Sequence, residues 1–528
     1  MSGPRAQAFA LGALLLLALA LRLPALESLP NPCGDEGNWA WYGVELAAGH
    51  RVALAPDARF VTLAFAHLIA LSLKLFGHSF AAVRAPLVAG VALGMVGAFA
   101  LARGLGRPRA GLVVAALLAA HPWSVMWSRT ATVPYALALC TMTCAPLALL
   151  AATRQGGARR WVVAGALLAA GLHFSPLALL TAVSCAGWML STPAARAQAR
   201  AAGPWLALAS AGLVASPVVL GAIAVAREGS TRPRHLFTVF GERLGVYLRT
   251  LLGAISGEST LRHFVAPRPS LAWELAAAAG VVAVVVAACW PRRDDDEVTR
   301  SLASLTRWGA MTSMLGTAVL LAPARTWNLP GIDAERYGFA VLAPFALALA
   351  TAASRRRGGP GAWLLCALAL VGPTRATLSS LRAGSGRDEG VWTLRGGGGY
   401  RGWKTSASAE AIATRIARDV DALRAGGPAT IVVADYAFHT LPFATGDAPV
   451  ETVDVAKREL PRAPGRPHLF VRWSDGLLAP RVRDARRAND ALTALMRSAR
   501  FTSLRLVRRL PQRDGAALLE LWSATHAP

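Results

Sequence analysis

Long apolar blocks of Leu, Ala and Val, separated by short clusters of arginine, dominate this chain. A block of about 18 or more apolar residues with few charges is long enough to cross a bilayer as a helix. In all, 54% of the residues are hydrophobic and 16% are charged, whereas about 25% are charged in soluble domains. The sequence therefore argues against a soluble protein and predicts a mainly α-helical, polytopic membrane protein.

The arginine clusters orient the expected helices. Clusters of Lys and Arg lie in cytoplasmic loops under the positive-inside rule, and placing every cluster there predicts eleven spans. We therefore expect the net charge of +25 to serve topology and lipid contact, with no nucleic-acid partner. The clusters are Arg103/Arg107/Arg109, Arg154/Arg159/Arg160, Arg196/Arg200, Arg292/Arg293 and Arg355/Arg356/Arg357, and the spans are 8–26, 84–102, 110–126, 135–152, 161–173, 175–192, 204–226, 271–290, 308–323, 337–353 and 361–379.

The odd number of spans fixes the expected sides. The chain starts in the cytoplasm of an inner (plasma) membrane protein, with the first span retained instead of cleaved as a signal. The C-terminal region is then periplasmic or extracellular. Residues 60–76 are apolar but carry His67 and Lys74, so we expect a juxtamembrane helix on the outer face. The alternative, a true span, would invert everything that follows.

Two domains are predicted. Residues 1–382 form the transmembrane domain and residues 383–528 a small soluble α/β domain, joined near the glycines 396–399. The alternation of helical and strand-like patterns in the tail supports the second domain. The expected helices are 407–424 and 481–498, and the strand-like runs are 431–435, 468–472, 503–509 and 516–522.

The sharpest local feature is the segment 34–42, directly after the first span, with Asp35 and Glu36 side by side. Adjacent acids at a membrane surface are costly unless they pair or act in chemistry. Residues 38–49 have the pattern of a short helix, which places both acids near its positive N-terminus. An acidic helix cap and a functional pair are both compatible with this spacing.

Three more features are expected at the outer face. Arg129 lies in the segment 127–135 at the outer end of the third span, and Arg336 in 333–337 at the mouth of the tenth. Each could bind a phosphate or anchor its helix by snorkelling. His173 ends a span and is more typical of packing than of catalysis. The six cysteines show no metal or disulfide spacing.

Together these motifs resemble GT-C glycosyltransferases, in particular the bacterial protein-mannosyltransferase-like (family 39) and aminoarabinose-transferase branch. The resemblance covers residues 8–380 and leaves the tail outside. It rests on the Asp35-Glu36 pair, Glu45-Leu46-x-x-Gly49, the run from Lys74 to Pro86, the turn from Gly104 to Arg109, Ser128-Arg129, and Glu335-Arg336-Tyr337 with the later Pro344.

The resemblance implies an enzyme that moves a sugar, with inversion, from a polyprenyl-phosphate donor to an extracytoplasmic acceptor. By analogy Asp35 is the general base, and Glu36 orients it or holds a metal. Arg59, Arg129 and Arg336 are the candidates for the donor phosphate. We expect either no bound metal or one divalent ion held weakly by the Asp35/Glu36 loop, and no other cofactor.

Two departures from the family pattern keep alternatives open. Relatives often have a second acid near the position of Pro134, and a Pro-Pro pair where this chain has Phe60-Val61-Thr62. A divergent acceptor or an inactive enzyme would explain both. A transporter, an envelope-assembly scaffold and a glycan ligase of similar fold are the competing functions, and the sequence names neither sugar, carrier nor acceptor.

Overall fold

A computed structural model gives the fold. It describes residues 3–24, 26–27, 34–52, 62–131, 133–198, 201–227, 240–257, 271–290, 292–321, 335–355, 430–433, 467–473, 483–498, 501–511 and 517–526. Within these ranges the backbone of Asp35 is described, but its side chain is not.

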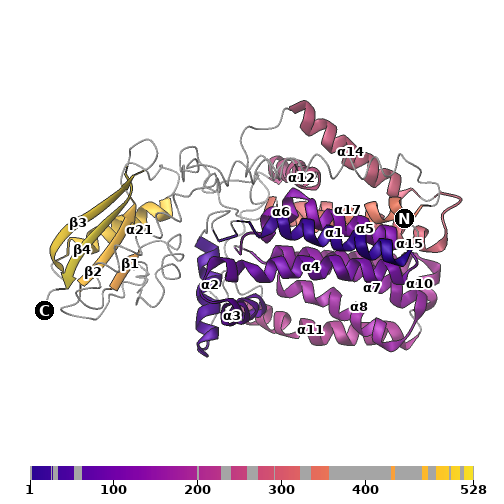
Figure 1. Ribbon diagram of the computed structural model, residues 1–528, viewed down its shortest axis with the longest axis horizontal. Coiled ribbons are helices and arrows are strands. Elements are labelled where there is room, and N and C mark those ends of the chain that lie inside the picture. Colours follow the sequence, from indigo (N-terminus) through magenta and orange to yellow (C-terminus); the bar gives the residue numbers. More distant parts are fainter. Residues whose placement is uncertain are drawn as a thin grey trace.

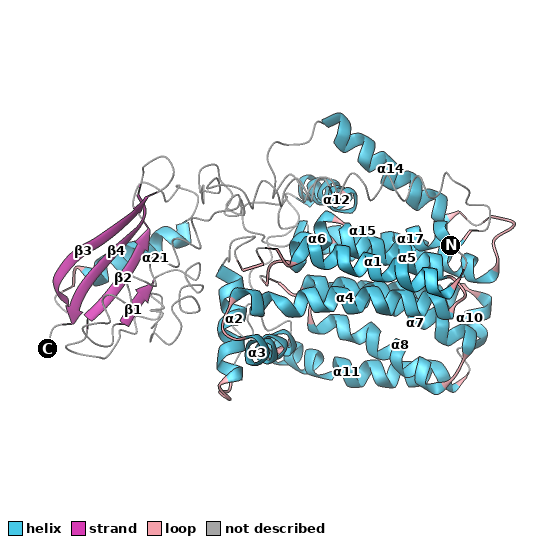
Figure 2. Ribbon diagram, viewed as in Figure 1, coloured by secondary structure: helices cyan, strands magenta, loops and turns pink. Residues whose placement is uncertain are grey.

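A bundle of helices running back and forth along one axis makes up most of the described chain (Figures 1 and 2). The N-terminus lies at one end of this bundle, and a small sheet lies beyond the other end. The helices are α1 (Pro4–Arg22), α2 (Gly34–Ala47), α3 (Ala64–Phe76), α4 (Phe80–Gly104), α5 (Pro108–Ala120), α6 (Pro122–Ser128), α7 (Tyr135–Gln155), α8 (Ala158–Ala170), α9 (Leu179–Ser191), α10 (Pro193–Gln198), α11 (Ala202–Arg227), α12 (Phe240–Ser256), α14 (Leu271–Cys289), α15 (Glu297–Leu321) and α17 (Phe339–Ser354).

Several of these helices match membrane spans in length and composition. In the described part, α1, α4, α7 and the segment Ala202–Ile223 of α11 are long and apolar enough to cross a bilayer. The helices α5 and α6, bent by 56°, make a fifth if they count as one span. Other apolar helices, including α9 and α17, are shorter. The expected span 361–379 lies outside the described residues, so the count of eleven stays a prediction.

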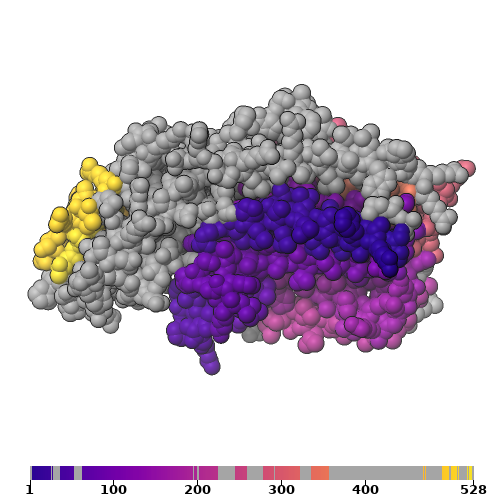
Figure 3. All heavy atoms as spheres, in the orientation of Figure 1, coloured from indigo at the N-terminus to yellow at the C-terminus, as the bar shows by residue number. Residues whose placement is uncertain are grey.

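Helix α1 lies along the outside of the bundle, where Figure 3 shows it in indigo across the visible face. Its Phe9 and Leu16 are 77% and 70% exposed. Exposed apolar side chains of this kind suit contact with lipid tails, because the tails are themselves apolar.

Helices α2 and α3 lie across the bundle end that faces the sheet, roughly perpendicular to the long helices (Figure 1). They pack on each other through Trp39, which meets the ring of Phe65 edge-on at 5.3 Å. A Cβ on Gly43 would collide with Ile69, so glycine allows this close contact. The orientation of α3 agrees with the juxtamembrane helix expected within residues 60–76, although α3 begins only at Ala64.

Helices α8 and α11 approach closely through glycine. A Cβ on Gly165 would collide with the backbone oxygen of Ala207, and one on Gly203 with the indole of Trp161. Small residues of this kind let membrane helices pack backbone to backbone. At Gly212, also on α11, a Cβ would have no atom within 4 Å.

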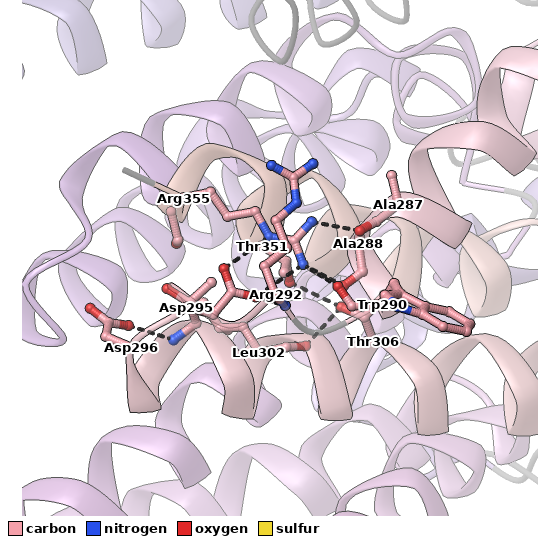
Figure 4. A network of polar contacts seen from close by, with 12 residues as sticks. Ala287, Ala288, Trp290, Arg292, Asp295, Asp296, Leu302, Thr306, Thr351 and Arg355 are labelled. Atoms are coloured by element: carbon pink, nitrogen blue, oxygen red, sulfur yellow. Dashed lines mark hydrogen bonds and ion pairs between the residues drawn. The ribbon is translucent and has the colours of Figure 1, made fainter. Parts of the chain in front are cut away.

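At the N-terminal end of the bundle, an acidic run from Asp294 to Glu297 meets arginines from three other segments, one of them the last turn of α7. Figure 4 shows Arg355, after α17, reaching Asp295 while its guanidinium also donates to the final carbonyls of α14. The Arg355 Nη2 to Asp295 Oδ2 distance is 3.2 Å, and both side chains are buried. Asp296 pairs with Arg107, and Glu297 lies 2.5 Å from Arg154. The run therefore ties three arginine clusters together.

The C-terminal region forms a four-stranded mixed sheet with the order β1-β2-β4-β3. Strands β1 and β2 are parallel, and the other pairs are antiparallel. Phe470, Leu492, Met496 and Phe501 join helix α21 to the sheet in one apolar core. The elements are β1 (Thr430–Val433), β2 (Pro467–Trp473), α21 (Arg483–Met496), β3 (Phe501–Pro511) and β4 (Ala517–His526).

The observed elements confirm the expected α-helical bundle with a small α/β region. Three details differ. The expected span 110–126 is broken at His121–Pro122, α15 begins well before residue 308, and α2 begins at Gly34 and not near 38. The expected tail helix 407–424 and the boundary at 382/383 lie outside the described residues.

Candidate functional site

Glu36 is the centre of the candidate site. It lies in the first turn of α2, and its side chain is fully buried. Arg84 Nε donates to Glu36 Oε1 at 2.7 Å and Arg84 Nη2 to Oε2 at 2.8 Å, a bidentate pair. The amide of Ala131 also donates to Oε1, at 2.7 Å. One carboxylate therefore joins α2, α4 and the loop after α6.

The start of α4 explains where Arg84 lies. Ser79 caps the helix, its Oγ accepting from the amide of Ala82. The carboxylate of Glu27 accepts from the amides of Phe80 and Ala81 at 3.0 and 2.6 Å. A negative charge here also suits the positive end of the helix dipole. Arg84 follows one turn later, and its Nη1 donates to Leu26 O at 2.6 Å.

A break between α5 and α6 shapes the next part of the site. Pro122 has no amide hydrogen, so the carbonyl of Leu118 loses its usual helical partner. His121 accepts the amide of Trp123 at its Nδ1, and its Nε2 donates to the carbonyl of Ile255 in α12 at 2.8 Å. His121 thus connects the break to α6 and to α12, and α6 is bent by 56° relative to α5.

Arg129, directly after α6, reaches back to the end of α1. Its guanidinium donates to the carbonyls of Leu21, Arg22 and Pro24 at 3.0, 2.6 and 2.7 Å. These are the contacts of a helix C-cap. Burial, and then the charge of Arg84, lowers the pKa of Arg129 to about 10, so the side chain is still a cation at neutral pH.

The start of α17 packs on the same region. Trp123 Nε1 donates to the carbonyl of Glu335 at 2.7 Å. Tyr135 lies with its ring 5.4 Å from Tyr337, and Arg336 places its guanidinium carbon 5.0 Å from the ring of Tyr337. The described parts of the three segments expected to carry function, 34–42, 127–135 and 333–337, therefore gather at one end of the bundle.

The structure describes some of the predicted site residues and leaves others outside the described ranges. Glu36 is paired with Arg84. Arg129 caps α1, and Arg336 is half-buried beside Tyr337. Arg59 and the side chain of Asp35 lie outside the described residues, so their roles stay predictions.

Sequence reasoning missed the roles of Arg84, Glu27 and Arg22. Arg84 and Arg22 are charges at the edges of apolar blocks, and both are fully buried. A charge at such a position is costly unless it is paired, which is the signal that could have identified them.

His173 has a structural role in the described part. Its Nε2 donates to the carbonyl of Val214 in α11 at 2.7 Å, which leaves Nδ1 to accept from the hydroxyl of Thr62 at 2.8 Å. The ring therefore ties the segment before α3 to α11, in agreement with the packing role expected for it.

No group of three or more His, Cys, Asp or Glu side chains among the described residues could hold a metal ion. Both carboxylate oxygens of Glu36 already accept hydrogen bonds. Glu36 is therefore better suited to holding α2 in place than to ligating a metal.

Comparisons with known proteins agree with this architecture. The sequence pattern of the dolichyl-phosphate-mannose-protein mannosyltransferase family matches residues 61–220. That range includes Arg84, Arg129 and His173, but not Asp35, Glu36, Arg59 or Arg336. No curated protein matches the chain by sequence.

In structure, the chain is similar to ArnT from Cupriavidus metallidurans bound to undecaprenyl phosphate, with 14% identity, 97% of each chain covered and a TM-score of 0.57. It also matches an oligosaccharyltransferase from Archaeoglobus fulgidus (13% identity, 84% of this chain and 63% of the other, TM-score 0.42) and the arabinofuranosyltransferase AftD from Mycobacteria (14% identity, 100% and 40%, TM-score 0.43). The likeness to ArnT covers the bundle and the tail together, and confirms the GT-C type of fold.

Proposed function

We propose that this chain is a membrane glycosyltransferase that moves a sugar from a polyprenyl-phosphate donor to an extracytoplasmic acceptor. The observation that carries the proposal is the contact of Glu36 with Arg84 and Ala131, which gathers the candidate segments at one end of a GT-C-type bundle. The match of residues 61–220 to a family of lipid-phosphate-dependent mannosyltransferases supports it, as does the likeness to an undecaprenyl-phosphate-bound protein.

Asp35 is the proposed general base. It removes the proton from the acceptor hydroxyl as that oxygen attacks the anomeric carbon of the sugar. The bond from the anomeric carbon to the phosphate oxygen breaks on the opposite face, and the bonding electrons leave with the lipid phosphate. The configuration therefore inverts.

Glu36 acts as a positioning residue in this scheme. Its carboxylate accepts from Arg84 and from the Ala131 amide, so it fixes the first turn of α2 and with it the backbone at residue 35. Holding a reacting group within a fraction of an ångström accounts for much of enzymatic rate enhancement.

Cations must stabilise the departing phosphate. Arg336 and Arg59 are the proposed phosphate-binding residues. Arg336 lies just before α17, next to the tyrosine that packs on Tyr135. Arg129, the third candidate, makes the contacts of a cap on α1, so we assign it a supporting role.

The decisive experiment replaces Asp35 by Asn in full-length protein in proteoliposomes supplied with undecaprenyl-phosphate-linked hexoses and pentoses and with lipid, glycan and protein acceptors. We expect transfer to fall by a factor on the order of 100 or more, the scale of a lost general base. Glu45→Gln is the matched control, because Glu45 is an acid of the same helix that pairs with the exposed His50.

The outcomes separate the alternatives. Full transfer by Asp35→Asn would disprove the assignment of the base. Absence of both transfer and donor binding in the unchanged protein would favour a transporter or a scaffold. Transfer only from lipid-diphosphate oligosaccharides would indicate a glycan ligase.

A further inference from the structure

We propose that Arg22 is a positioning residue for the candidate site, acting through the break between α5 and α6. Its structural effect is independent of the function proposed above, whereas its effect on turnover rests on that function. The observation behind it is a reciprocal exchange of side chains. Arg22, at the end of α1, reaches into the break, while Arg129, at the end of α6, reaches back to the end of α1.

All five N–H donors of Arg22 have partners, and every one of these partners is an uncharged oxygen. Nε donates to Ser128 Oγ at 2.8 Å. Nη1 donates to the carbonyls of Ala18 and Ala119 at 3.1 and 2.7 Å. Nη2 donates to the carbonyl of Leu118 and to Ser124 Oγ at 2.7 and 3.0 Å.

Two of these partners, the carbonyls of Leu118 and Ala119, lose their helical donors at the break, and Leu118 also accepts from Ser124 Oγ at 2.7 Å. Pro122 cannot donate to Leu118, and the amide of Trp123, which would serve Ala119 in a continuous helix, donates to His121. A buried backbone oxygen without a partner costs about as much as a lost hydrogen bond. Arg22 therefore stabilises the bent form of this helix pair over a straight one.

The bend places the loop that holds Glu36. Ser128, the last residue of α6, accepts from Arg22 and is followed at once by Arg129, which caps α1. Two residues later, the amide of Ala131 donates to Glu36. A shift of the α6 end would therefore be passed directly to Glu36 and the first turn of α2.

A buried cation with neutral partners is poor evidence for stability, because its desolvation offsets much of what its hydrogen bonds contribute. What the planar guanidinium supplies is geometry, since five donors in one rigid fork fix five acceptors in relation to each other. A lysine keeps the charge but has three donors on a single nitrogen. Arg22→Lys thus tests position more than charge.

Arg355→Lys is the matched control. Arg355 is also buried, and it caps the carbonyls of Ala287, Ala288 and Trp290, but at the opposite end of the bundle (Figure 4). Both variants would be compared with the unchanged full-length protein in the same lipid, by hydrogen exchange over residues 127–135 and by steady-state transfer.

In Arg22→Lys we expect the Ala131 amide to exchange at least about tenfold faster, equivalent to about 1.4 kcal/mol of local opening. We expect kcat to fall about tenfold or more while KM for the donor changes less than about threefold, since the loss is one of alignment. Arg355→Lys should leave exchange in this segment, and kcat per folded molecule, within about twofold of the unchanged protein.

The two proposals can fail separately. Unaltered exchange over 127–135 in Arg22→Lys would refute the inference whatever the activity. Faster exchange with unchanged kcat would show a structural role only, and would also overturn it. If exchange is faster in Arg22→Lys but the unchanged protein itself transfers no sugar, the structural link from Arg22 to Ala131 is upheld and the proposed function is rejected.

If Arg22→Lys does not fold, Ser128→Ala takes its place. This change removes the Nε acceptor and leaves the other four contacts of Arg22. It should also make the Ala131 amide exchange faster. An exchange rate equal to that of the unchanged protein would contradict the inference.

Discussion

At the scale of single residues, the buried pair of Glu36 and Arg84 dominates the candidate site. Two side chains, both with no exposed surface, meet in bidentate geometry, and the carboxylate also holds the Ala131 amide. Breaking such a pair is far more damaging than its net contribution suggests, because the remaining charge is left buried without compensation.

Glu36→Gln should therefore destabilise the protein by about 3 kcal/mol or more, since Arg84 would lose its charged partner. Unfolding in detergent, followed by tryptophan fluorescence, measures the change. Glu45→Gln should cost less than about 1 kcal/mol, because its pair with His50 is exposed. Equal stability of the two variants would contradict the structural role of Glu36.

The sequence predicted Glu36 near a helix N-terminus but not its partner. Hydropathy and spacing place a residue within its own segment, whereas Arg84 lies 48 residues after Glu36, beyond α3. The contacts of Arg129 with the end of α1 were not predicted, for a related reason. An arginine at the end of a span looks the same in sequence whether it faces a ligand or caps a neighbouring helix.

At the scale of elements, close packing of α8 on α11 depends on glycines that leave no room for a side chain. Gly165 lies against the backbone of Ala207, while Gly212 on α11 faces open space. The helix boundaries themselves follow well from the apolar blocks, and α4, α7 and α8 lie close to their expected spans. The break at Pro122 was missed because the apolar pattern continues across it.

Gly165→Ala should destabilise the protein by about 1–3 kcal/mol, because the added methyl group forces α8 and α11 apart. Gly212→Ala is the control, at a glycine of α11 that faces open space. It should be neutral or stabilising by up to about 1 kcal/mol, since alanine is the better helix former. Thermal unfolding of both variants in one detergent measures this, and a less stable Gly212→Ala would argue against close packing as the cause.

At the scale of the whole molecule, the two chain ends lie at opposite ends of the bundle. The N-terminus is at the end with the acidic run, and α2, α3 and the C-terminal sheet are at the other (Figure 1). The odd number of spans, and with it the side of the membrane on which each end lies, stays a prediction from the arginine alternation. The sequence could not define the strand order of the tail, because β2 pairs with β1 and with β4, both of which are far from it in the sequence.

Reporter fusions test the orientation of the whole molecule. Fusions after residues 107, 157, 198 and 355 should report the cytoplasm, and those after 40, 250 and 400 the extracytoplasmic side, as the positive-inside rule requires. Alkaline phosphatase and green fluorescent protein fusions give opposite signals on the two sides. A cytoplasmic signal after residue 400 would overturn the eleven-span topology.

The acidic run from Asp294 to Glu297 has a consequence for biogenesis. The ribosome makes Arg107 and Arg154 long before Asp296 and Glu297, and Arg355 only afterwards. The early arginines are therefore uncompensated while their own helices are being oriented, and acquire their acidic partners once the later helices arrive. The same arginines therefore serve first as orientation signals during insertion and then as ion-pair partners between the completed helices.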